Sequence, residues 1–251
     1  MPINTHQHIG YRPTWAEVNL QALAHNFNQV KKAVPGGTKI MATVKADAYG
    51  HGLIPVAGKL SACGVDYFGV ASIDEGIKLR SAGIKKPVLI LGLILKEDIE
   101  PLFEYNLIPT ICTYELAQAL NSLAGKLKQK IKAHIKIDTG MGRIGVGRDE
   151  ALSLIKRISS FKFIEIEGVF THFAFADTDK QFTSRQIKSF NNLISQLKEE
   201  GINIPYRHTA NSMGILAYRS SHFNMVRPGL VLYGLYPKQN LKVKLKPVLS
   251  L

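Results

Sequence analysis

The sequence predicts an α/β chain folded as a (β/α)8 barrel. Eight short apolar runs rich in β-forming residues recur along the 251 residues, and most are followed by a stretch with helical spacing. Strands that alternate with helices indicate a parallel sheet, and eight such units in about 250 residues is the usual size of this barrel. A doubly wound open sheet is the alternative fold.

The predicted strands follow one another in the order expected of repeated βα units. They are residues 39–46, 67–72, 87–92, 108–112, 133–138, 166–173, 206–211 and 224–229. Predicted helices lie between them at 54–62, 73–82, 96–104, 114–124, 149–159 and 183–200. The last helix carries an apolar stripe that includes Phe190 and Leu197, and it ends at Gly201, a residue that commonly terminates helices.

The two ends of the sequence do not fit the barrel count. Residues 14–23 alternate like a strand before the first βα unit, and residues 242–251 read as a strand with no evident partner. We therefore expect an N-terminal segment at 1–12, a barrel at 13–235, and at 236–251 the start of a second, β-rich domain within which the chain is cut.

Composition narrows the classes of function. A net charge of +13 leaves nucleic acids, membrane surfaces and anionic small ligands as possible partners. No clustered basic helix or aromatic RNA-binding motif supports nucleic acid. Cys63 and Cys112 stand in apolar surroundings without a CxxC pattern, which argues against a zinc ribbon or a disulfide framework. No export signal is evident and the longest apolar run, 87–95, is half the length of a membrane span, so we expect a cytoplasmic protein.

Strand alternation places a lysine at the mouth of the barrel. In the first strand, Ile40, Ala42, Val44 and Ala46 form an apolar face, so Met41, Thr43, Lys45 and Asp47 take the inward face. Lys45 is then near the carboxyl end of the strand, where barrels place their catalytic groups. A partly desolvated lysine amine can attack a carbonyl, although a snorkelling surface lysine is the alternative interpretation.

Other strands end on the same side with polar residues. The fifth strand points His134, Lys136 and Asp138 inward, the sixth ends at His172, and the eighth carries Arg227. The seventh places His208 and Ser212 on one face and Asn211 on the other. A lone histidine in a strand is usually a hydrogen-bonded core residue, but core packing does not require five strands to end in polar groups on one side.

Two loop regions that follow strand ends indicate which kind of ligand the barrel binds. The pattern Gly140, Gly142, Gly145 follows the fifth strand and lacks the acidic residue about 20 positions further on that a dinucleotide site needs. Barrels commonly hold a phosphate at the ends of the seventh and eighth strands, where Asn211, Ser212, Gly229 and Leu230 lie. An inward lysine beside a phosphate site suits pyridoxal 5'-phosphate (PLP) bound as an imine.

The motifs also resemble a known family. VKADAYGHG (44–52), KIDTGMGRIG (136–145), THFAFAD (171–177), HTANS (208–212) and VRPGLVLYG (226–234) resemble alanine racemase, in order and across nearly the whole barrel. The resemblance implies a cytoplasmic, PLP-dependent, homodimeric isomerase that interconverts L- and D-alanine and supplies D-alanine for cell-wall peptidoglycan.

The resemblance also assigns roles to residues. Lys45 would form the Schiff base and serve as one of two catalytic bases. Tyr49, Ser212 and the backbone at Gly229 and Leu230 would contact the phosphate, and Asn211 lies in the same loop. Arg143 would face the phenolic oxygen of PLP, held by Lys136, which is often carbamylated in this family. Arg227 would hydrogen-bond the pyridine nitrogen with His208 behind it, and His172 would pack beside the ring. No metal is expected.

Racemisation needs a base on each face of the substrate Cα. In the family the second base is a tyrosine from the C-terminal domain of the partner subunit, and none of the nine tyrosines here matches it. We therefore expect this chain to bind PLP but to racemise poorly or not at all. The alternatives are a single-domain PLP-binding protein involved in cofactor homeostasis, and a barrel decarboxylase, which would need a carboxylate in place of Arg227.

Overall fold

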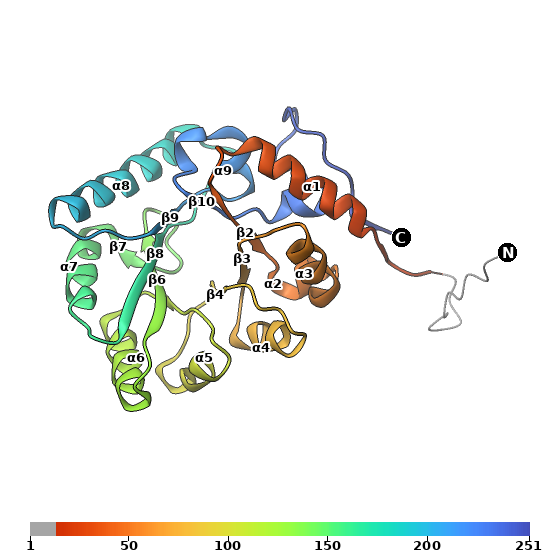
Figure 1. Cartoon of the computed structure of the whole chain (residues 1–251). Coiled ribbons are helices and arrows are strands. Elements are labelled where there is room, and N and C mark those ends of the chain that lie inside the picture. The colour runs from red at the N-terminus through yellow and green to blue at the C-terminus, as the bar shows by residue number, and fades with distance from the viewer. Residues whose placement is uncertain (1–13) are drawn as a thin grey trace.

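The eight apolar runs form the parallel inner strands of the computed structural model, which describes residues 14–251 (Figure 1). In chain order these strands are β2 (Lys39–Thr43), β3 (Tyr67–Val70), β4 (Val88–Ile90), β5 (Thr110–Ile111), β6 (Ile131–Asp138), β8 (Ile164–Phe170), β9 (Tyr206–His208) and β10 (Met225–Val226). The short strand β7 (Val146–Gly147) pairs with the end of β6.

The strands close into a barrel. Parallel pairing runs through β10-β2-β3-β4 and through β5-β6-β8-β9. A parallel bridge between Leu89 and Ile108 joins the first group to the second. On the other side, the Arg227 N–H donates to the Ala210 carbonyl at 2.9 Å, between the ends of β9 and β10. The predicted (β/α)8 barrel is confirmed, and the open-sheet alternative is wrong.

Helices cover the outside of the strands, as Figure 1 shows. They are α3 (Leu53–Ala62), α4 (Ile73–Ser81), α5 (Glu100–Glu104), α6 (Tyr114–Leu127), α7 (Arg148–Ser159) and α8 (Lys180–Glu199), and all except α5 are close to prediction. Side-chain caps start three of them, because Ser72, Thr113 and Asp179 each accept a backbone N–H of the first turn. The helix predicted at 96–104 is instead a 3-10 turn, η1 (Lys96–Asp98), followed by α5, where Pro101 occupies the first turn.

The N-terminal part of the barrel differs from its prediction. Only β1 (Glu17–Val18) is extended within the strand predicted at 14–23, and α1 (Leu20–Ala33) follows at once. The Asn19 side chain caps this helix by accepting the N–H groups of Gln21 and Ala22. Leu23, Phe27 and Val30 are buried at helical spacing, a stripe that continues beyond the alternating residues. The predicted segment 1–12 lies outside the described residues.

The C-terminal residues have a partner. The strand predicted at 242–251 is reduced to β11 (Leu249–Ser250), which pairs antiparallel with β1, so the expectation of an unpaired strand was wrong. The Asn26 side chain donates to the carbonyls of Leu232 and Lys246, at 3.0 and 2.8 Å. It also accepts the Lys246 N–H at 2.8 Å. These bonds hold the segment against α1, and the domain boundary at residue 235 stays a prediction.

The inner and outer faces of the strands are both apolar but pack against different partners. Ile40, Ala42 and Val44 belong to the large core between strands and helices. Met41 points the other way and belongs to a cluster inside the barrel, together with side chains from around the barrel, namely Tyr67, Leu89, Ile108, Phe170 and Met225. Side chains therefore fill the barrel, and the space for a ligand lies at one end of it.

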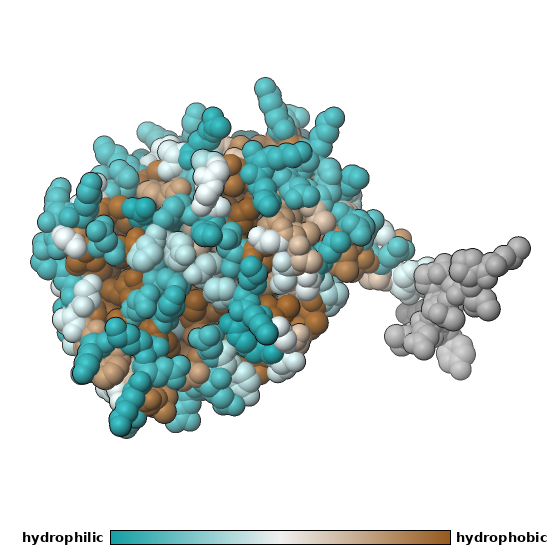
Figure 2. All heavy atoms as spheres, viewed as in Figure 1, coloured by the Kyte–Doolittle hydropathy of each residue, from teal (hydrophilic) through white to brown (hydrophobic). Residues whose placement is uncertain are grey.

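The outer surface is mostly hydrophilic on the face seen in Figure 2, with apolar patches between the projecting polar side chains. Within residues 14–251, no helix is both long enough and apolar enough to span a membrane.

Candidate active site

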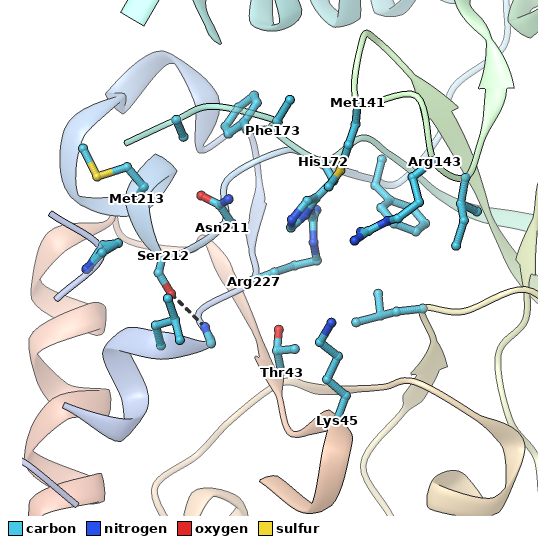
Figure 3. A pocket seen from close by; sticks show the side chains of 18 of the residues that line it. Thr43, Lys45, Met141, Arg143, His172, Phe173, Asn211, Ser212, Met213 and Arg227 are labelled. Carbon is cyan, nitrogen blue, oxygen red and sulfur yellow. Dashed lines mark hydrogen bonds between the residues drawn. The ribbon is translucent and has the colours of Figure 1, made fainter. Parts of the chain in front are cut away.

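A cavity of about 580 Å³ opens at the carboxyl ends of the barrel strands (Figure 3). Ten of the predicted site residues line it: Lys45, Tyr49, Lys136, Arg143, His172, Asn211, Ser212, Arg227, Gly229 and Leu230. The eleventh, His208, lies behind Arg227 and does not line the cavity. Residues distant in sequence thus meet at one place, which is the convergence that the strand ends predicted.

Lys45 stands at the start of a strained turn, α2 (Lys45–Gly50). The next four residues, Ala46 to Tyr49, have φ between +52° and +55°, a left-handed conformation that costs about 1–2 kcal/mol per non-glycine residue. The Asp47 carboxylate holds the turn by accepting the Leu53 N–H at 2.7 Å. Asp47 was predicted to face inward, but it is exposed because strand alternation stops at Val44. The turn leaves the Lys45 side chain pointing into the cavity, as Figure 3 shows.

Arg227 is buried at the inner wall and held by four hydrogen bonds. Its Nη1 donates to His208 Nδ1 at 2.7 Å and to the His208 carbonyl at 2.8 Å. Its Nη2 donates to the carbonyls of Thr171 and Thr209, at 2.6 and 3.2 Å. None of these bonds uses Nε. The guanidinium therefore has a fixed orientation and keeps a donor for a ligand.

Positive charge dominates the cavity. Lys45, Lys136, Arg143 and Arg227 line it, and Asp177 is the one carboxylate among the lining residues of the described chain. Burial, reinforced by the charges of Arg227 and Arg143, lowers the pKa of Lys136 to about 8. Such a site favours an anionic ligand.

The histidines at the site do not add to this charge. Burial, together with the nearby cations, lowers the pKa of His172 to about 3. Burial also lowers the pKa of His208 well below its ordinary value. Both rings are therefore neutral near pH 7, and the net positive charge comes from lysine and arginine alone.

The loops after β9 and β10 meet at a corner with free donors. Ser212 Oγ accepts the N–H of Gly229 at 3.0 Å, the bond dashed in Figure 3. Among the hydrogen bonds of residues 14–251, none uses the N–H of Ser212, Met213 or Leu230. A Cβ at Gly229 would lie 2.9 Å from the Tyr49 hydroxyl, so only glycine leaves that hydroxyl its place. Backbone N–H groups without a partner thus belong to residues that border one corner of the cavity, and unpaired backbone donors at such a corner suit an oxyanion such as phosphate.

Asn211 was predicted to face away from Ser212, and this was wrong. Strand β9 ends at His208, and Asn211 instead caps the short helix α9 (Ser212–Ala217) by accepting the Gly214 N–H at 3.0 Å. Both residues line the cavity because the chain turns between strand and helix. Alternation along a strand does not predict orientation past its end.

The glycine-rich loop after β6 is structural. Asp138, predicted to point into the barrel, uses its carboxylate to accept the N–H groups of Gly140, Met141 and Gly142, each at 2.8 Å. A Cβ at Gly145 would lie 2.7 Å from the Asp138 backbone nitrogen. The folded loop directs Arg143 toward the cavity, as seen in Figure 3.

Sequence reasoning missed several lining residues. Most are apolar: Leu91, Met141, Ile144, Phe173 and Pro237 come from loops, and Met213 comes from α9. Asp177, in the THFAFAD motif, was also missed. The apolar side chains carry no chemistry that singles them out, and only their position after a strand end could have suggested them.

We expect the stability of the fold to fall as the pH drops from 7 to 5. His172 stays neutral in the fold while an unfolded chain binds a proton near pH 6.5, so the unfolded state holds more protons below that pH. His172 contributes a loss of about 2 kcal/mol over this range, and His134, His208 and His222, whose pKa values burial also lowers, act in the same direction. Urea unfolding at several pH values measures this slope. The free energy of unfolding should change less with pH in His172→Gln. A free energy of unfolding that is unchanged between pH 7 and 5 would contradict the prediction.

Comparison with known proteins identifies relatives along nearly the whole chain. The family described as "Alanine racemase, N-terminal domain" matches residues 18–237. An alanine racemase of Halothermothrix orenii is 48% identical over 242 residues, covering 95% of this chain and 64% of the relative. One of Carboxydothermus hydrogenoformans is 48% identical over 244 residues, covering 96% and 66%. The chain thus spans just under two thirds of the length of these relatives.

Solved structures show the same architecture. The alanine racemase of Clostridium difficile in complex with cycloserine superposes with a TM-score of 0.92 at 38% identity, over 96% of this chain and 67% of that one. The enzyme of Bacillus anthracis with bound L-Ala-P gives a TM-score of 0.89 at 38% identity, over 96% and 64%. Taken with the family match over most of its residues, these likenesses establish that the chain belongs to the alanine racemase family.

Proposed function

We propose that the protein is a PLP-dependent racemase that interconverts L- and D-alanine. The observation that carries the proposal is the meeting of the Lys45 amine, the fixed Arg227 guanidinium and a corner of free N–H donors in one cavity. PLP requires three features of a protein. These are an amine that reacts with its aldehyde, a hydrogen-bond donor to its ring nitrogen, and a set of donors that binds its phosphate.

The hydrogen-bond donors that line the cavity fit both the phosphate and the ring of this cofactor. Ser212, Tyr49 and the N–H of Leu230 would hold the phosphate, with Asn211 shaping the loop. Gly229 would contribute space, since its own N–H already donates to Ser212. Arg143 would face the phenolic oxygen with Lys136 beside it, and His172 would pack against the ring. When bound, PLP stabilises negative charge at the substrate Cα.

Arg227 restrains the chemistry at the ring nitrogen. Burial lowers the pKa of its guanidinium to about 9, so it remains charged at neutral pH. A guanidinium donates hydrogen bonds but does not supply the full proton that a carboxylic acid partner would favour. This arrangement suits proton removal and return at one carbon better than the reactions of a decarboxylase, which was the alternative.

Lys45 would move the proton on one face of the substrate Cα. Tyr49 is the one tyrosine among the described residues that line the cavity, and its hydroxyl lies next to Gly229, where we propose that the phosphate binds. The proposal therefore assigns one base to residues 14–251. It also includes a homodimer in the cytoplasm that supplies D-alanine for the cell wall, on the strength of the family relationship. A role in cofactor homeostasis alone would need no substrate base.

The test is proton exchange at the Cα of alanine. The chain is incubated in D2O with PLP and either L- or D-alanine, and mass spectrometry follows deuterium at Cα while chiral chromatography follows inversion. We expect deuterium incorporation that depends on PLP, faster for the enantiomer whose proton faces Lys45. Release of CO2 from a basic amino acid with no exchange in alanine would instead support the decarboxylase. PLP binding without exchange in either enantiomer would support the binding protein.

A further inference from the structure

A line of buried polar side chains runs from Arg227 away from the cavity. His208 Nε2 lies 2.8 Å from His134 Nδ1, and His134 Nε2 lies 3.4 Å from Glu167 Oε2. Lys132 Nζ donates to the other oxygen, Oε1, at 2.7 Å. Glu167 is 4% exposed and both histidines are fully buried, whereas Lys132 lies near the start of β6, at the end of the barrel opposite the cavity. The line therefore crosses the barrel interior.

The direction of each hydrogen bond in this line is determined by its two ends. Arginine only donates, and an ionised carboxylate only accepts. Burial opposes the charge of Glu167, but the bonds from His134 and Lys132 outweigh it and hold its pKa below the ordinary value. Burial keeps both histidines neutral, so each ring has one donor and one acceptor. His208 and His134 must both carry their proton on Nε2.

We infer that Glu167 is a positioning residue for Arg227, which it orients through His134 and His208 across the barrel. If His134 carried its proton on Nδ1, that proton would face the Nε2–H of His208. A matching change in His208 would then turn an N–H toward the Arg227 guanidinium. The carboxylate at one end thus ensures that a lone pair meets the guanidinium at the other. The effect on a hydrogen bond from Arg227 to a cofactor nitrogen rests on the proposed function. The direction of the hydrogen bonds along the line does not.

Packing keeps the rings from turning out of line. The His208 ring stacks on Phe170 at a centroid distance of 4.7 Å and an angle of 6°. The Arg227 guanidinium lies 5.2 Å from the centre of the same Phe170 ring. Tyr67 and Tyr206 flank His134, with ring centroids 6.4 and 6.5 Å from it. The tautomers are therefore the remaining freedom in the line, and the donor Arg227 at one end and the acceptor Glu167 at the other fix them together.

The first test needs neither a variant nor a cofactor. Ring ¹⁵N NMR of the histidine-labelled chain between pH 6 and 8 reports the protonated nitrogen of each ring. We expect His134 and His208 to be neutral with the proton on Nε2. A proton on Nδ1 of either ring would overturn the inference. Because PLP is absent, this result is independent of the proposed function.

The second test removes the terminal acceptor. Glu167→Leu should leave His134, the ring that loses its acceptor, with a mixture of tautomers, whereas Glu167→Gln keeps an amide oxygen and should retain the Nε2 proton. Glu165→Leu is the matched control, because Glu165 is half-exposed and 4.0 Å from the same Lys132 amine. If PLP binds the chain, Glu167→Leu should weaken its retention by about tenfold, the effect of losing one charge-assisted hydrogen bond. A Glu167→Leu protein that folds with the His134 tautomer unchanged would overturn the inference.

Discussion

Replacing Lys45 by alanine should abolish the visible absorption band of PLP bound to the protein and reduce alanine exchange by about 10²–10⁴-fold or more. Lys45 is the amine that projects from the start of α2, just after β2, into the cavity, and its removal leaves the aldehyde without a covalent partner there. It also removes the one base that we assign to the described residues. Absorbance titration with PLP measures the first effect, and deuterium exchange at Cα measures the second.

A matched control separates the loss of the Lys45 amine at the cavity from the loss of one positive charge on the protein. Lys59→Ala removes a lysine from α3 that does not line the cavity, and it should leave the absorption band and the deuterium exchange unchanged. Lys136 is the other lysine that lines the cavity. If the band persists in Lys45→Ala and disappears in Lys136→Ala, the assignment of the Schiff-base lysine is wrong.

Gly168→Ala should destabilise the fold by about 3 kcal/mol. A Cβ at this position in β8 would meet the His134 ring, at 2.5 Å from Cε1. The ring cannot move away freely because it is fully buried, so the substitution combines overpacking with loss of a buried hydrogen bond. The midpoint of urea unfolding measures the change in the free energy of unfolding.

Gly147→Ala is the control for this substitution. Gly147 precedes α7 with φ of −57°, and a Cβ there would have no neighbour within 4 Å. The free energy of unfolding of Gly147→Ala should therefore differ little from that of the unchanged protein. Equal stabilities for the two variants would show that His134 relaxes at little cost. The line of hydrogen bonds through the barrel would then be less rigid than its packing indicates.

Much of the fold follows from local patterns in the sequence. Residues 39–44 alternate between two apolar faces, and the structure uses one for the helices and the other for the barrel interior. Helix α1 was missed because residues 14–23 alternate by chance before its stripe of Leu23, Phe27 and Val30 becomes evident. The pairing of β1 with β11 depends on contacts between the two ends of the sequence, which no local pattern contains.

The site was predictable where its chemistry stands at strand ends. Lys45, His172 and Arg227 are polar residues that follow apolar runs, and all three line the cavity. Asn211 and Asp47 were misoriented because each lies where the chain leaves its strand. Glu167 gave no signal, since a glutamate in the segment IEIEGVF reads as a solvated strand residue until the fold places His134 beside it.

In the left-handed turn after Lys45, the same four residues lower the stability of the fold and position the Lys45 amine. Its total strain, on the order of 4–8 kcal/mol, is comparable to the whole net stability of a typical domain. Glycine would relieve much of this strain, but it would also loosen the backbone that aims the Lys45 amine. Selection for thermostability and selection for turnover therefore favour different residues in this segment. Directed evolution toward either property should reveal the trade-off here sooner than in the regular outer helices.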